Sequence, residues 1–531
     1  MVTVILLVSL LRPSKSKAPP TLKERIPFVS NTIQYLTDCG TFLDRVSETF
    51  KTTNTNIVKF YLAGTPAYIV AGTANVQRML RTVDSLDGNF LNLLLMDKFW
   101  GMSHSEIDKF AQDHSGRGKT ALPGTEGTPP EQRIWHSHDQ LYVEFLSKHK
   151  YIDALADSFY RLFNERLDRQ SKDEWQTVEV FRFLQTAMTE SAIISLFGSQ
   201  IVDLNPDIIE AYYAFDRIAN KLAWGFPKFV QPKNVAARER LHDMSKRHID
   251  SAWKNFDWDG PDADSVWEPH FGSRLSRETA KWFRERGFSS YAAAGHTLST
   301  LFGLNGNTVP ITTWALITIT RDPVLLQAVR EEAESTYVVD PATGVRRIDP
   351  QKLVSLPLLQ SIYIEMMRMH VSFNITRRAT QQVVIDGYVI PKGAIVQTCA
   401  QIAHFEEDVW GVEGHPASEF WAYRHVKVAD VVDEKTGEVV GQKKQFAMKG
   451  RPSSFFPFGG GHVMCPGRHF AKQEIMLAIA IIVTKFDIEF VEWTELDGTR
   501  RERQAEDDRR YAGFVAISPD GDMRIRWKRR W

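Results

Sequence analysis

A glycine-rich segment that carries one cysteine directly ahead of a helix constrains this chain more than any other feature. Residues 455–468 read FFPFGGGHVMCPGR, and a helical pattern of apolar residues runs from His469 to Ile482. Glycines supply positive φ and let the backbone approach a flat ligand closely. The free N–H groups at a helix start favour a thiolate over a thiol. The segment therefore predicts that Cys465 presents a sulfur ligand at a helix N-terminus.

Cysteine usage singles out the same residue. The chain has three cysteines, Cys39, Cys399 and Cys465. Three are too few for a disulfide framework, which fits a reducing compartment. A buried free cysteine usually packs as a small hydrophobic side chain, and we interpret Cys39 and Cys399 in that way. Only Cys465 has surroundings that would make its sulfur an electron donor.

The spacing of four residues in this segment resembles a known signature. Phe458, Gly461, Cys465 and Gly467 are similar to the haem-binding signature of the cytochrome P450 family. The resemblance implies a mainly α fold with small β-sheets, in which heme b is buried between a long kinked helix and the cysteine loop. It implies Cys465 as the axial iron ligand, and Phe458, Gly461 and Gly467 as cofactor-binding residues. Such a thiolate is the donor that O–O bond cleavage needs.

The chain differs from most of the family at a residue that would pair with a haem propionate. Most of the family carries a basic residue two positions before the cysteine, where this chain has Val463, with His462 displaced by one. By similarity to the family, Arg377 would neutralise a propionate, because a guanidinium fork matches a carboxylate. Arg378 beside it competes for that role.

A second element is a carboxylate and a guanidinium three residues apart in the predicted helix 358–370. Glu365 and Arg368 share a helix face and can pair. Their place, before a strand region and 97 residues before the cysteine, resembles the family's buried Glu–Arg pair. Arg424 resembles the third partner of that pair. We expect the three to position the cysteine loop, and an ordinary structural ion-pair network is the alternative.

The residues 301–314 predict a long helix that Pro310 kinks, because proline lacks a backbone N–H. By resemblance, this helix lies over the haem and its kink holds dioxygen. The family's usual acid–threonine pair is replaced by Gly306/Asn307 or by Asn307/Thr308, according to the register, and the acid is missing in both. Asn307 and Thr308 are the predicted catalytic residues, and a packing defect in a core helix is the alternative.

This Asn-Thr-x-Pro helix, together with residues 215–216, 224–227 and 511–513, resembles one branch of the family. That branch contains cholesterol 7-alpha-hydroxylase, sterol 12-alpha-hydroxylase and prostacyclin synthase. It implies a bulky, apolar small-molecule substrate of sterol, terpenoid or polyketide type. Three residues are expected to line the pocket: Trp224, Phe226 and Phe514.

The implied activity is insertion of one oxygen atom from O₂, with electrons from NADPH through NADPH-cytochrome P450 reductase. Two alternatives stay open. A redox-neutral haem-thiolate isomerase or dehydratase is favoured by the missing acid. A non-catalytic haem binder, or a helical protein without haem, would have Cys465 as a packed thiol.

The remaining sequence features concern location and partners. Residues 2–11 are an apolar run of about half the length that crosses a bilayer, and basic residues follow it. We expect residues 1–20 to form a short membrane anchor and a stiff proline-containing linker, and residues 21–531 to form a single haem-thiolate catalytic domain. This predicts an endoplasmic reticulum membrane location with the catalytic domain facing the cytoplasm. A frayed N-terminus is the alternative. Lys plus Arg equals Asp plus Glu at 65 each, which argues against nucleic-acid binding.

Secondary-structure patterns divide the rest of the chain. Residues 57–71 predict a β-hairpin with its turn at 64–66, residues 374–399 predict a second strand region, and the middle is α-rich. The stretches 101–131 and 256–275 are expected to be irregular, as functional lids or disordered insertions.

Two histidines follow the first irregular stretch, at the start of a predicted helix. His136 and His138 flank Ser137 and come directly after Trp135. We expect both to be solvated, and the alternative is that one reaches a haem propionate.

Overall fold

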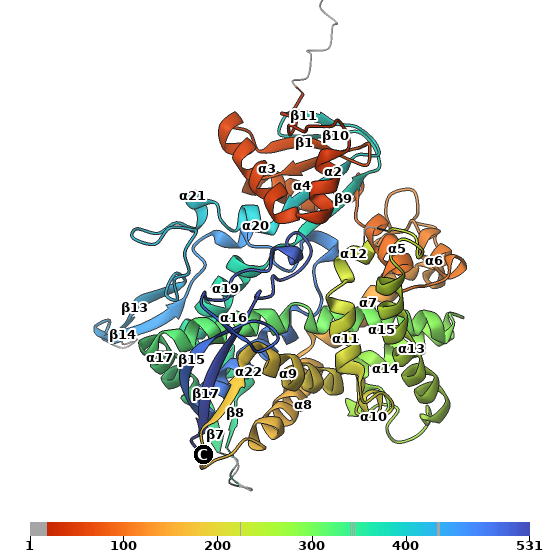
Figure 1. Cartoon of the computed structure of the whole chain (residues 1–531). Coiled ribbons are helices and arrows are strands. Elements are labelled where there is room, and N and C mark those ends of the chain that lie inside the picture. The colour runs from red at the N-terminus through yellow and green to blue at the C-terminus, as the bar shows by residue number, and fades with distance from the viewer. Residues whose placement is uncertain (1–17, 224, 340, 342–343, 345, 433–435) are drawn as a thin grey trace, which may run out of the picture.

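The computed structural model describes residues 18–223, 225–339, 341, 344, 346–432 and 436–531. It confirms a mainly α-helical chain with small β-sheets (Figure 1). The α-helices are α2 (Ser30–Thr37), α3 (Cys39–Thr53), α4 (Thr73–Arg81), α5 (Asn89–Lys98), α6 (His104–Ala111), α7 (Ile134–Ser147), α8 (His149–Asp168), α9 (Val180–Phe197), α10 (Gln200–Asp203), α11 (Ile208–Asp216), α12 (Ala219–Ala223), α13 (Pro232–Asn255), α14 (Arg274–Glu285), α15 (Ser290–Asn305), α16 (Thr308–Arg321), α17 (Pro323–Glu334), α18 (Pro350–Leu353), α19 (Pro357–His370), α20 (Ala400–Ala403), α21 (Glu407–Trp410) and α22 (Arg468–Lys485).

The strands are short and form several separate sheets. They are β1 (Ile57–Leu62), β2 (Thr65–Val70), β3 (Leu86–Asp87), β4 (Gln176–Glu179), β5 (Trp267–Glu268), β6 (Gly272–Ser273), β7 (Tyr337–Val339), β8 (Arg346–Ile348), β9 (Asn374–Ala379), β10 (Val383–Ile385), β11 (Tyr388–Ile390), β12 (Ile395–Cys399), β13 (Val426–Val432), β14 (Val439–Phe446), β15 (Phe486–Thr494), β16 (Arg500–Arg501) and β17 (Asp522–Arg529).

The largest sheet has the order β1-β2-β12-β9-β3 and lies with α2, α3 and α4 in the upper part of Figure 1. The predicted hairpin is confirmed as β1 and β2, with its turn one residue earlier than expected. Ala63 and Gly64 both have positive φ, 47° and 83°, as a two-residue hairpin turn of the right twist requires. The second strand region pairs β9 antiparallel to β12. A second sheet, β16-β15-β17-β4, lies in the lower part of the molecule in Figure 1.

The end of the predicted linker, residues 18–20, lies against the sheet. Pro19 is buried, and the carbonyl of Pro20 accepts a hydrogen bond of 2.8 Å from the backbone N–H of Lys59 on β1. These residues extend the edge of the sheet, because an edge strand offers unpaired backbone groups. The greater part of the predicted anchor, residues 1–17, lies outside the described residues. No helix among those that are described is both long and apolar enough to cross a membrane.

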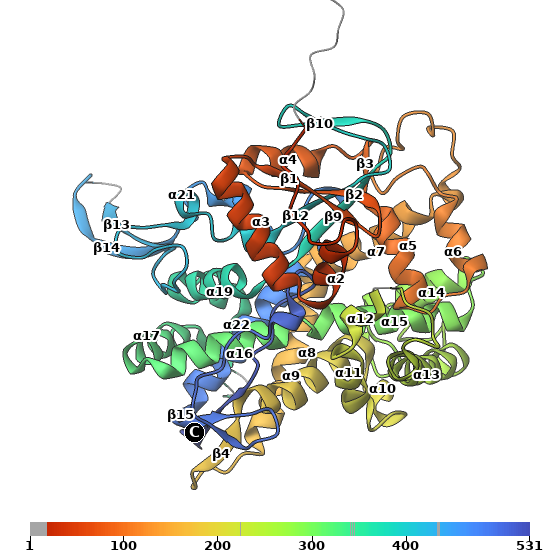
Figure 2. The same cartoon turned by 45° about the horizontal axis from the view of Figure 1, so that its top comes forward.

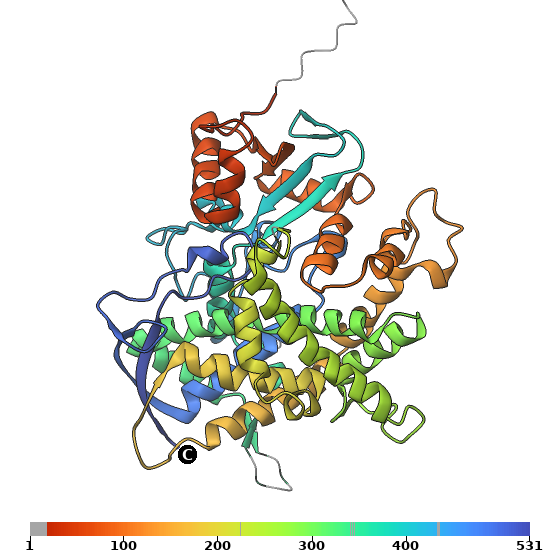
Figure 3. The ribbon, with the colours of Figure 1, turned by 45° about the vertical axis from the view of Figure 1, so that its right-hand side comes forward.

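The long central helix is broken, as Pro310 predicts. The break between α15 and α16 falls at Gly306 and Asn307, and both helices run through the middle of the molecule (Figures 2 and 3). Gly306 lies four residues before Pro310, and its carbonyl is the one that a proline N–H would have bonded and that the proline ring pushes away. Thr308 bridges the gap, since its hydroxyl donates to the carbonyl of Leu304 at 2.8 Å.

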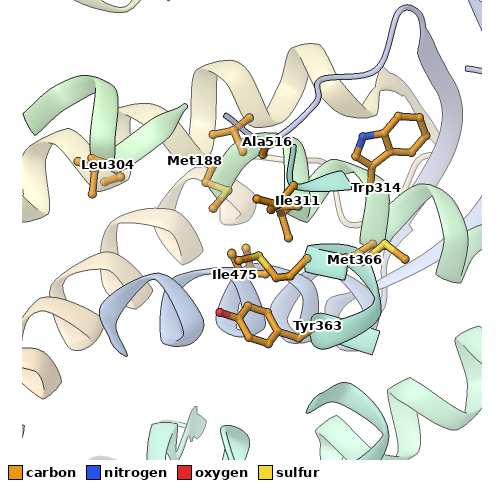
Figure 4. Close-up of a cluster of buried hydrophobic side chains, with 14 of the residues drawn as sticks. Met188, Leu304, Ile311, Trp314, Tyr363, Met366, Ile475 and Ala516 are labelled. Atoms are coloured by element: carbon orange, nitrogen blue, oxygen red, sulfur yellow. The ribbon is translucent and has the colours of Figure 1, made fainter. Parts of the chain in front are cut away.

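The core lies where α16 packs against α9, α19 and α22. Figure 4 shows Ile311 of α16 between these helices, with Ile475 of α22 and Met366 of α19 below it. All three are buried to 1–2% exposure or less, and each apolar side chain of this size contributes about 1.5–3 kcal/mol through burial. Because α22 is buried nearly all round after its first turn, the loop that precedes it is anchored firmly.

The stretch 101–131 is more ordered than expected. It contains α6, and the loop after α6 is tied down by Arg133, which donates from Nε to the Ser115 hydroxyl at 3.1 Å and from Nη1 to the Lys119 carbonyl at 2.8 Å. The Asp113 carboxylate accepts the backbone N–H of Trp135 at 2.9 Å and caps the entrance to α7. Polar side chains therefore hold this loop in place. It lacks the hydrophobic periodicity on which a prediction of secondary structure relies.

One hairpin was missed by the sequence analysis. Strands β13 and β14 pair antiparallel and project from the body of the molecule (Figure 2). Most of their residues are exposed on both faces, so the alternation of buried and exposed residues that marks a half-buried strand is weak there.

Candidate cofactor and substrate site

The cysteine loop has a geometry that its glycines allow. Gly459 and Gly461 have positive φ, 75° and 67°, and a Cβ on Gly461 would lie 2.4 Å from the carbonyl oxygen of Leu80. A side chain there would clash with backbone that has little freedom to move. The backbone N–H of Cys465 donates to the Phe458 carbonyl at 2.8 Å, which closes the loop. Phe458 and the glycines thus shape the segment that carries the sulfur.

The sulfur lies at the start of α22, as predicted. Gly467 is the N-cap residue of this helix. A Cβ built on Gly467 would lie 3.9 Å from Cys465 Sγ. Burial raises the pKa of Cys465, while the N–H groups of Gly467 and Arg468 and the charge of Arg468 lower it. Burial disfavours the anion here, so a bound cation is what would hold this sulfur as a thiolate.

Three basic side chains gather beside the loop. Arg377 on β9 is 4% exposed, and its Nη2 donates to the Gly460 carbonyl at 3.2 Å. No described carboxylate lies within ion-pair distance of it, and burial lowers its pKa to about 10. Burial lowers the pKa of His462 to about 4, and the charges of Arg377 and Arg117 act in the same direction. The buried His462 Nδ1 has no hydrogen-bond partner among the described residues. Such a cluster fits an anion, because each donor is already desolvated.

The neighbouring arginine points elsewhere. Arg378 is exposed and lies over the ring of Phe90, 5.2 Å from its centroid. On a strand, successive side chains face opposite sides of the sheet, so only Arg377 faces the loop.

Arg117 was not found by the sequence analysis. It comes from the loop before α7, and its Nη1 pairs with Asp139 Oδ1 at 2.6 Å. Its carbonyl lies 3.0 Å from His136 Nδ1. Nothing in the local pattern marks this loop arginine as half-buried, so a tertiary contact alone reveals it.

The predicted buried network is present and larger than expected. Arg368 donates to Glu365 through two nitrogens at 2.7 and 3.0 Å, and Arg424 Nε donates to the same carboxylate at 2.9 Å. His425, a fourth member that the sequence analysis missed, lies 3.3 Å from Glu365 Oε1. Burial alone would raise the pKa of Glu365, but hydrogen bonds from His425 and Arg368 outweigh it and hold the pKa at about 2. The carboxylate is therefore ionised in the core.

This network reaches the cysteine loop through one histidine. Arg368 Nη1 donates to the carbonyl of His404 at 3.1 Å. The Nε2 of His404 accepts the backbone N–H of Phe456 at 3.3 Å, and its ring stacks on Phe455. The residues before the cysteine are thus tied to the ion pair, which fits a positioning role for Glu365 and Arg368.

One face of the broken helix borders open space. Thr300, Gly303 and Asn307 recur at spacings of three and four, which places them on one helix face, and each is at least partly exposed in mid-helix. A Cβ built on Gly303 would meet no atom within 4 Å. Asn307 therefore faces the open side, whereas Thr308 is 3% exposed and lies against Glu474 of α22. The structure separates the two residues that were predicted to act together.

Four phenylalanines pack together beside α15. Phe302 of α15 lies 5.6 Å from Phe99 and 5.8 Å from Phe514, between ring centroids, and Phe215 of α11 lies 5.5 Å from Phe99. We call this set the aromatic roof. Of the three predicted wall residues, Phe514 belongs to the roof. Phe226 is 43% exposed on the loop before α13, and Trp224 lies outside the described residues.

A polar pair lies beside the roof. The Tyr511 hydroxyl donates to Asp216 Oδ2 at 3.2 Å, which joins α11 to the C-terminal segment that carries Phe514. Burial raises the pKa of Asp216 to about 7. This pair brings together two of the motifs on which the branch resemblance rested.

The other two cysteines are free thiols, as expected. Cys399 is 1% exposed, and burial raises its pKa to about 12. Burial likewise raises the pKa of Cys39. Both also lie at helix starts, Cys39 as the first residue of α3 and Cys399 as the N-cap residue of α20, but neither lies in a glycine-rich loop like that of Cys465.

The residues present fit a haem. A sulfur on a tight loop, a desolvated arginine and an unpartnered histidine nitrogen for carboxylates, and an open helix face are the features that such a cofactor needs. The expectation that His136 and His138 are solvated is wrong for His138, which is 6% exposed and lies 3.2 Å from His296 between their Nε2 atoms.

Known proteins share these features. Residues 124–501 match the family model described as Cytochrome P450. Cytochrome P450 monooxygenase calL of Penicillium decumbens is 43% identical over 518 residues, 98% of this chain and 94% of that protein. Cytochrome P450 monooxygenase efuG of Hormonema carpetanum is 27% identical over 97% of this chain and 90% of its own length. Cholesterol 7-alpha-monooxygenase of Cricetulus griseus is 25% identical over 68% of each chain, in line with the branch resemblance. With its cysteine loop, buried Glu–Arg network and broken central helix, this chain belongs to the cytochrome P450 family and is one of its monooxygenases.

Proposed function

We propose that this monooxygenase hydroxylates or otherwise oxidises a bulky apolar small molecule of sterol, terpenoid or polyketide type. The observation that carries the proposal is the aromatic roof, which includes Phe302 of α15. Phe99, Phe215, Phe302 and Phe514 come from four separate segments, and they offer apolar area with few polar groups. Apolar lining with a small number of polar positions is typical of sites for large hydrophobic ligands.

The cofactor assignment rests on the residues around the loop. Cys465 would ligate the iron of heme b, with Phe458, Gly461 and Gly467 shaping its loop, and Arg377, Arg117 and His462 would hold the carboxylates. The haem supplies the oxygen-activating chemistry when bound. The chain's own part is to orient the substrate beneath the roof, to exclude water, and to deliver protons.

The redox partner and the location are part of the same proposal. Electrons would come from NADPH through NADPH-cytochrome P450 reductase, and the chain would lie at the endoplasmic reticulum membrane, facing the cytoplasm, with residues 1–20 as anchor and linker and 21–531 as one catalytic domain. Exposed apolar side chains support a membrane surface as partner: Ile26, Phe28, Val29, Ile33, Phe229 and Val230.

The names of the relatives guide the choice of substrates. One relative acts on cholesterol by its name, and the fungal relatives are named only as P450 monooxygenases. A panel of sterols, terpenoids and polyketides therefore covers the proposal.

The test is a product analysis with the full chain, its haem, NADPH and the reductase. We expect one panel member to gain a single oxygen atom that derives from isotope-labelled dioxygen, and no product without oxygen. A rearranged product that forms without NADPH and O₂ would instead point to a redox-neutral isomerase, which the absence of an acid beside Asn307 makes worth testing. The fraction of substrate bound is followed separately by the shift of the haem absorbance, so failure to bind and failure to react are distinguished.

A further inference from the structure

The guanidinium of Arg117 is held on three sides. Its Nε donates to Asn89 Oδ1 at 2.8 Å, and its Nη1 donates to Asp139 Oδ1 at 2.6 Å. The guanidinium carbon lies 4.2 Å from the ring centroid of Trp135, a distance typical of a cation–π contact. No described residue accepts a hydrogen bond from Nη2, and the side chain as a whole is 10% exposed. One edge of the guanidinium is therefore largely desolvated and has donors left for a further acceptor.

The carboxylate of Asp139 is the strongest of these three contacts. Asp139 and Trp135 lie one turn apart on α7, so they approach Arg117 from the same face of that helix. Burial alone would raise the pKa of Asp139, but His138 and Arg117 outweigh burial and lower it below its ordinary value. The carboxylate is therefore ionised. A charged acceptor fixes a guanidinium more strongly than a neutral amide oxygen does, so Asp139 is the residue that anchors Arg117.

The loop that carries Arg117 is fixed by buried side chains on both sides of it. Asp113 accepts the backbone N–H of Ser115 at 2.8 Å and the hydroxyl of the same residue at 2.6 Å. Arg133 Nη2 donates to the carbonyl of Gly118. Asp113 and Arg133 are both buried. The backbone of Arg117 is thus held in place from within the loop, and its side chain starts from a defined position.

Arg117 and Arg377 meet the same short segment at the start of α5. Asn89, which accepts from Arg117 Nε, directly follows Gly88, and a Cβ built on Gly88 would lie 3.1 Å from Arg377 Nη1. Arg377 Nη2 in turn donates to the Gly460 carbonyl of the cysteine loop at 3.2 Å. Two guanidinium groups repel each other where water is scarce, and an anion beside them relieves that repulsion. Residues 88–89 therefore place Arg117 on the side of the cysteine loop where a haem carboxylate would lie.

We propose that Asp139 is a positioning residue for the cofactor: it holds Arg117 so that Nη2 donates to a haem carboxylate beside Arg377. The inference rests on the proposed haem site and deepens it, because Asp139 does not itself touch the cofactor and acts only through Arg117. Helix α7 supplies the acid and the aromatic ring, and the loop before α7 supplies the guanidinium. Without Arg117, the negative charge of Asp139 would repel a haem carboxylate, so its effect on haem binding depends on whether Arg117 is present.

The test is a double-mutant cycle on haem loss, measured as haem transfer from the holoenzyme to apomyoglobin. We expect Asp139→Asn and Arg117→Leu each to speed the transfer by about tenfold or more, because groups that orient the ligands of a cofactor typically change affinity by about 10–100-fold. In the Arg117→Leu background, Asp139→Asn should bring no further increase, since the carboxylate then has no cation to position.

Two further variants serve as controls. Asp139→Glu keeps the charge and should recover most of the wild-type rate of haem transfer. Glu165→Gln removes the partner of Arg161 from a surface pair whose side chains are 53% and 55% exposed. It should keep the wild-type rate, because an exposed pair of this kind contributes little.

A second measurement separates positioning from a general loss of structure. Resonance Raman spectra of the ferric holoenzyme should show the same change in the bending mode of a haem carboxylate in Asp139→Asn and in Arg117→Leu, and no change in Glu165→Gln. An unchanged bending mode in Asp139→Asn refutes the proposal. So does an equal increase in haem loss from Asp139→Asn with and without Arg117. Should the double variant fold poorly, the bending mode of the single variant decides.

Neither measurement needs substrate or turnover. A wild-type enzyme that binds haem and yields no oxygenated product would therefore refute the proposed oxidation, and the role of Asp139 would still be decided by the cycle. A wild-type chain that shows no Soret band would refute the cofactor assignment and, with it, this role.

Discussion

The side-chain oxygen of Asn307 accepts a hydrogen bond of 2.9 Å from the backbone N–H of Ala516. Asn307 lies in the break between α15 and α16, and Ala516 lies two residues after Phe514 of the aromatic roof. One hydrogen bond therefore joins the break between α15 and α16 to the segment that carries Phe514. Because the oxygen is engaged, the amide nitrogen is the part of Asn307 that remains for the open side.

Replacing Asn307 with alanine should loosen this connection. The backbone N–H of Ala516 would lose its partner, and we expect a loss of about 1 kcal/mol in the free energy of unfolding. The product distribution should broaden, since the segment that carries Phe514 is less firmly held. Chemical denaturation and product analysis measure the two effects. A variant with wild-type stability and wild-type products would contradict the role assigned to this bond.

Cys465→Ala should abolish the red-shifted Soret band of the reduced carbonyl complex, because that band reports a thiolate bound to iron. Cys399→Ala is the control, since Cys399 is a packed thiol that is 1% exposed, and it should keep the band with a modest loss of stability. Absorbance spectra of the purified variants decide the matter. Retention of the band in Cys465→Ala would overturn the ligand assignment.

Arg377→Leu should weaken cofactor retention, whereas Arg378→Leu should not. Arg377 is 4% exposed and faces the cysteine loop, and loss of a desolvated partner for a carboxylate typically costs about 2–5 kcal/mol. The Arg378 side chain is exposed. The rate of haem transfer to apomyoglobin compares the two. Equal rates in both variants would show that neither arginine holds the cofactor.

Glu365 should make the fold sensitive to acid in a defined window. Its pKa is held at about 2, below the ordinary value of 4.5, so its contribution to stability is complete above pH 4.5 and is lost as the pH falls toward 2. The contribution amounts to about 3 kcal/mol. Thermal unfolding from pH 5 downward should therefore show a steeper loss in wild type than in Glu365→Gln, which starts less stable.

The control for this prediction is an exposed carboxylate. Glu144 forms a surface pair with Lys148, with side chains 42% and 58% exposed, and such pairs contribute little. Glu144→Gln should keep the acid profile of the wild type. If Glu365→Gln keeps it as well, the carboxylate is not the group that titrates.

Two glycines of α15 should respond in opposite ways to an added methyl group. A Cβ on Gly303 would meet open space, whereas a Cβ on Gly295 would lie 2.3 Å from the carbonyl oxygen of Trp100. Gly303→Ala should keep or slightly raise stability, because alanine favours helix by about 1 kcal/mol over glycine, and should weaken substrate binding by narrowing the open face. Gly295→Ala should destabilise the fold. Melting temperature and spectral substrate titration separate these outcomes, and the reverse ranking would contradict the position of the open face.

Local signals predicted several parts of the site. The loop of Cys465 was found because its glycines and the helix after it lie in one continuous segment. The break at Gly306 and Asn307 follows from Pro310, since proline acts on the carbonyl four residues back. Glu365 and Arg368 were found because they share a helix face and because their place before the strand region and the cysteine resembles the family's Glu–Arg pair.

Long-range contacts escaped prediction for the opposite reason. Arg117 acts electrostatically on His462 across more than 300 positions, and His138 meets His296 across 158. The residues around His138 and around His296 do not differ in pattern from those around a histidine that faces water. His138 was therefore expected to be solvated.

The sequence by itself determined the position of the sulfur, the break in the central helix and the buried Glu–Arg pair, because each depends on residues within one turn or one loop. Only the tertiary structure decided that Arg377 rather than Arg378 faces the loop, that Asn307 and Thr308 point to different sides, and that His138 lies against His296. These outcomes depend on how helices and strands from distant parts of the chain pack together, and the energies of that packing are not encoded in any single segment.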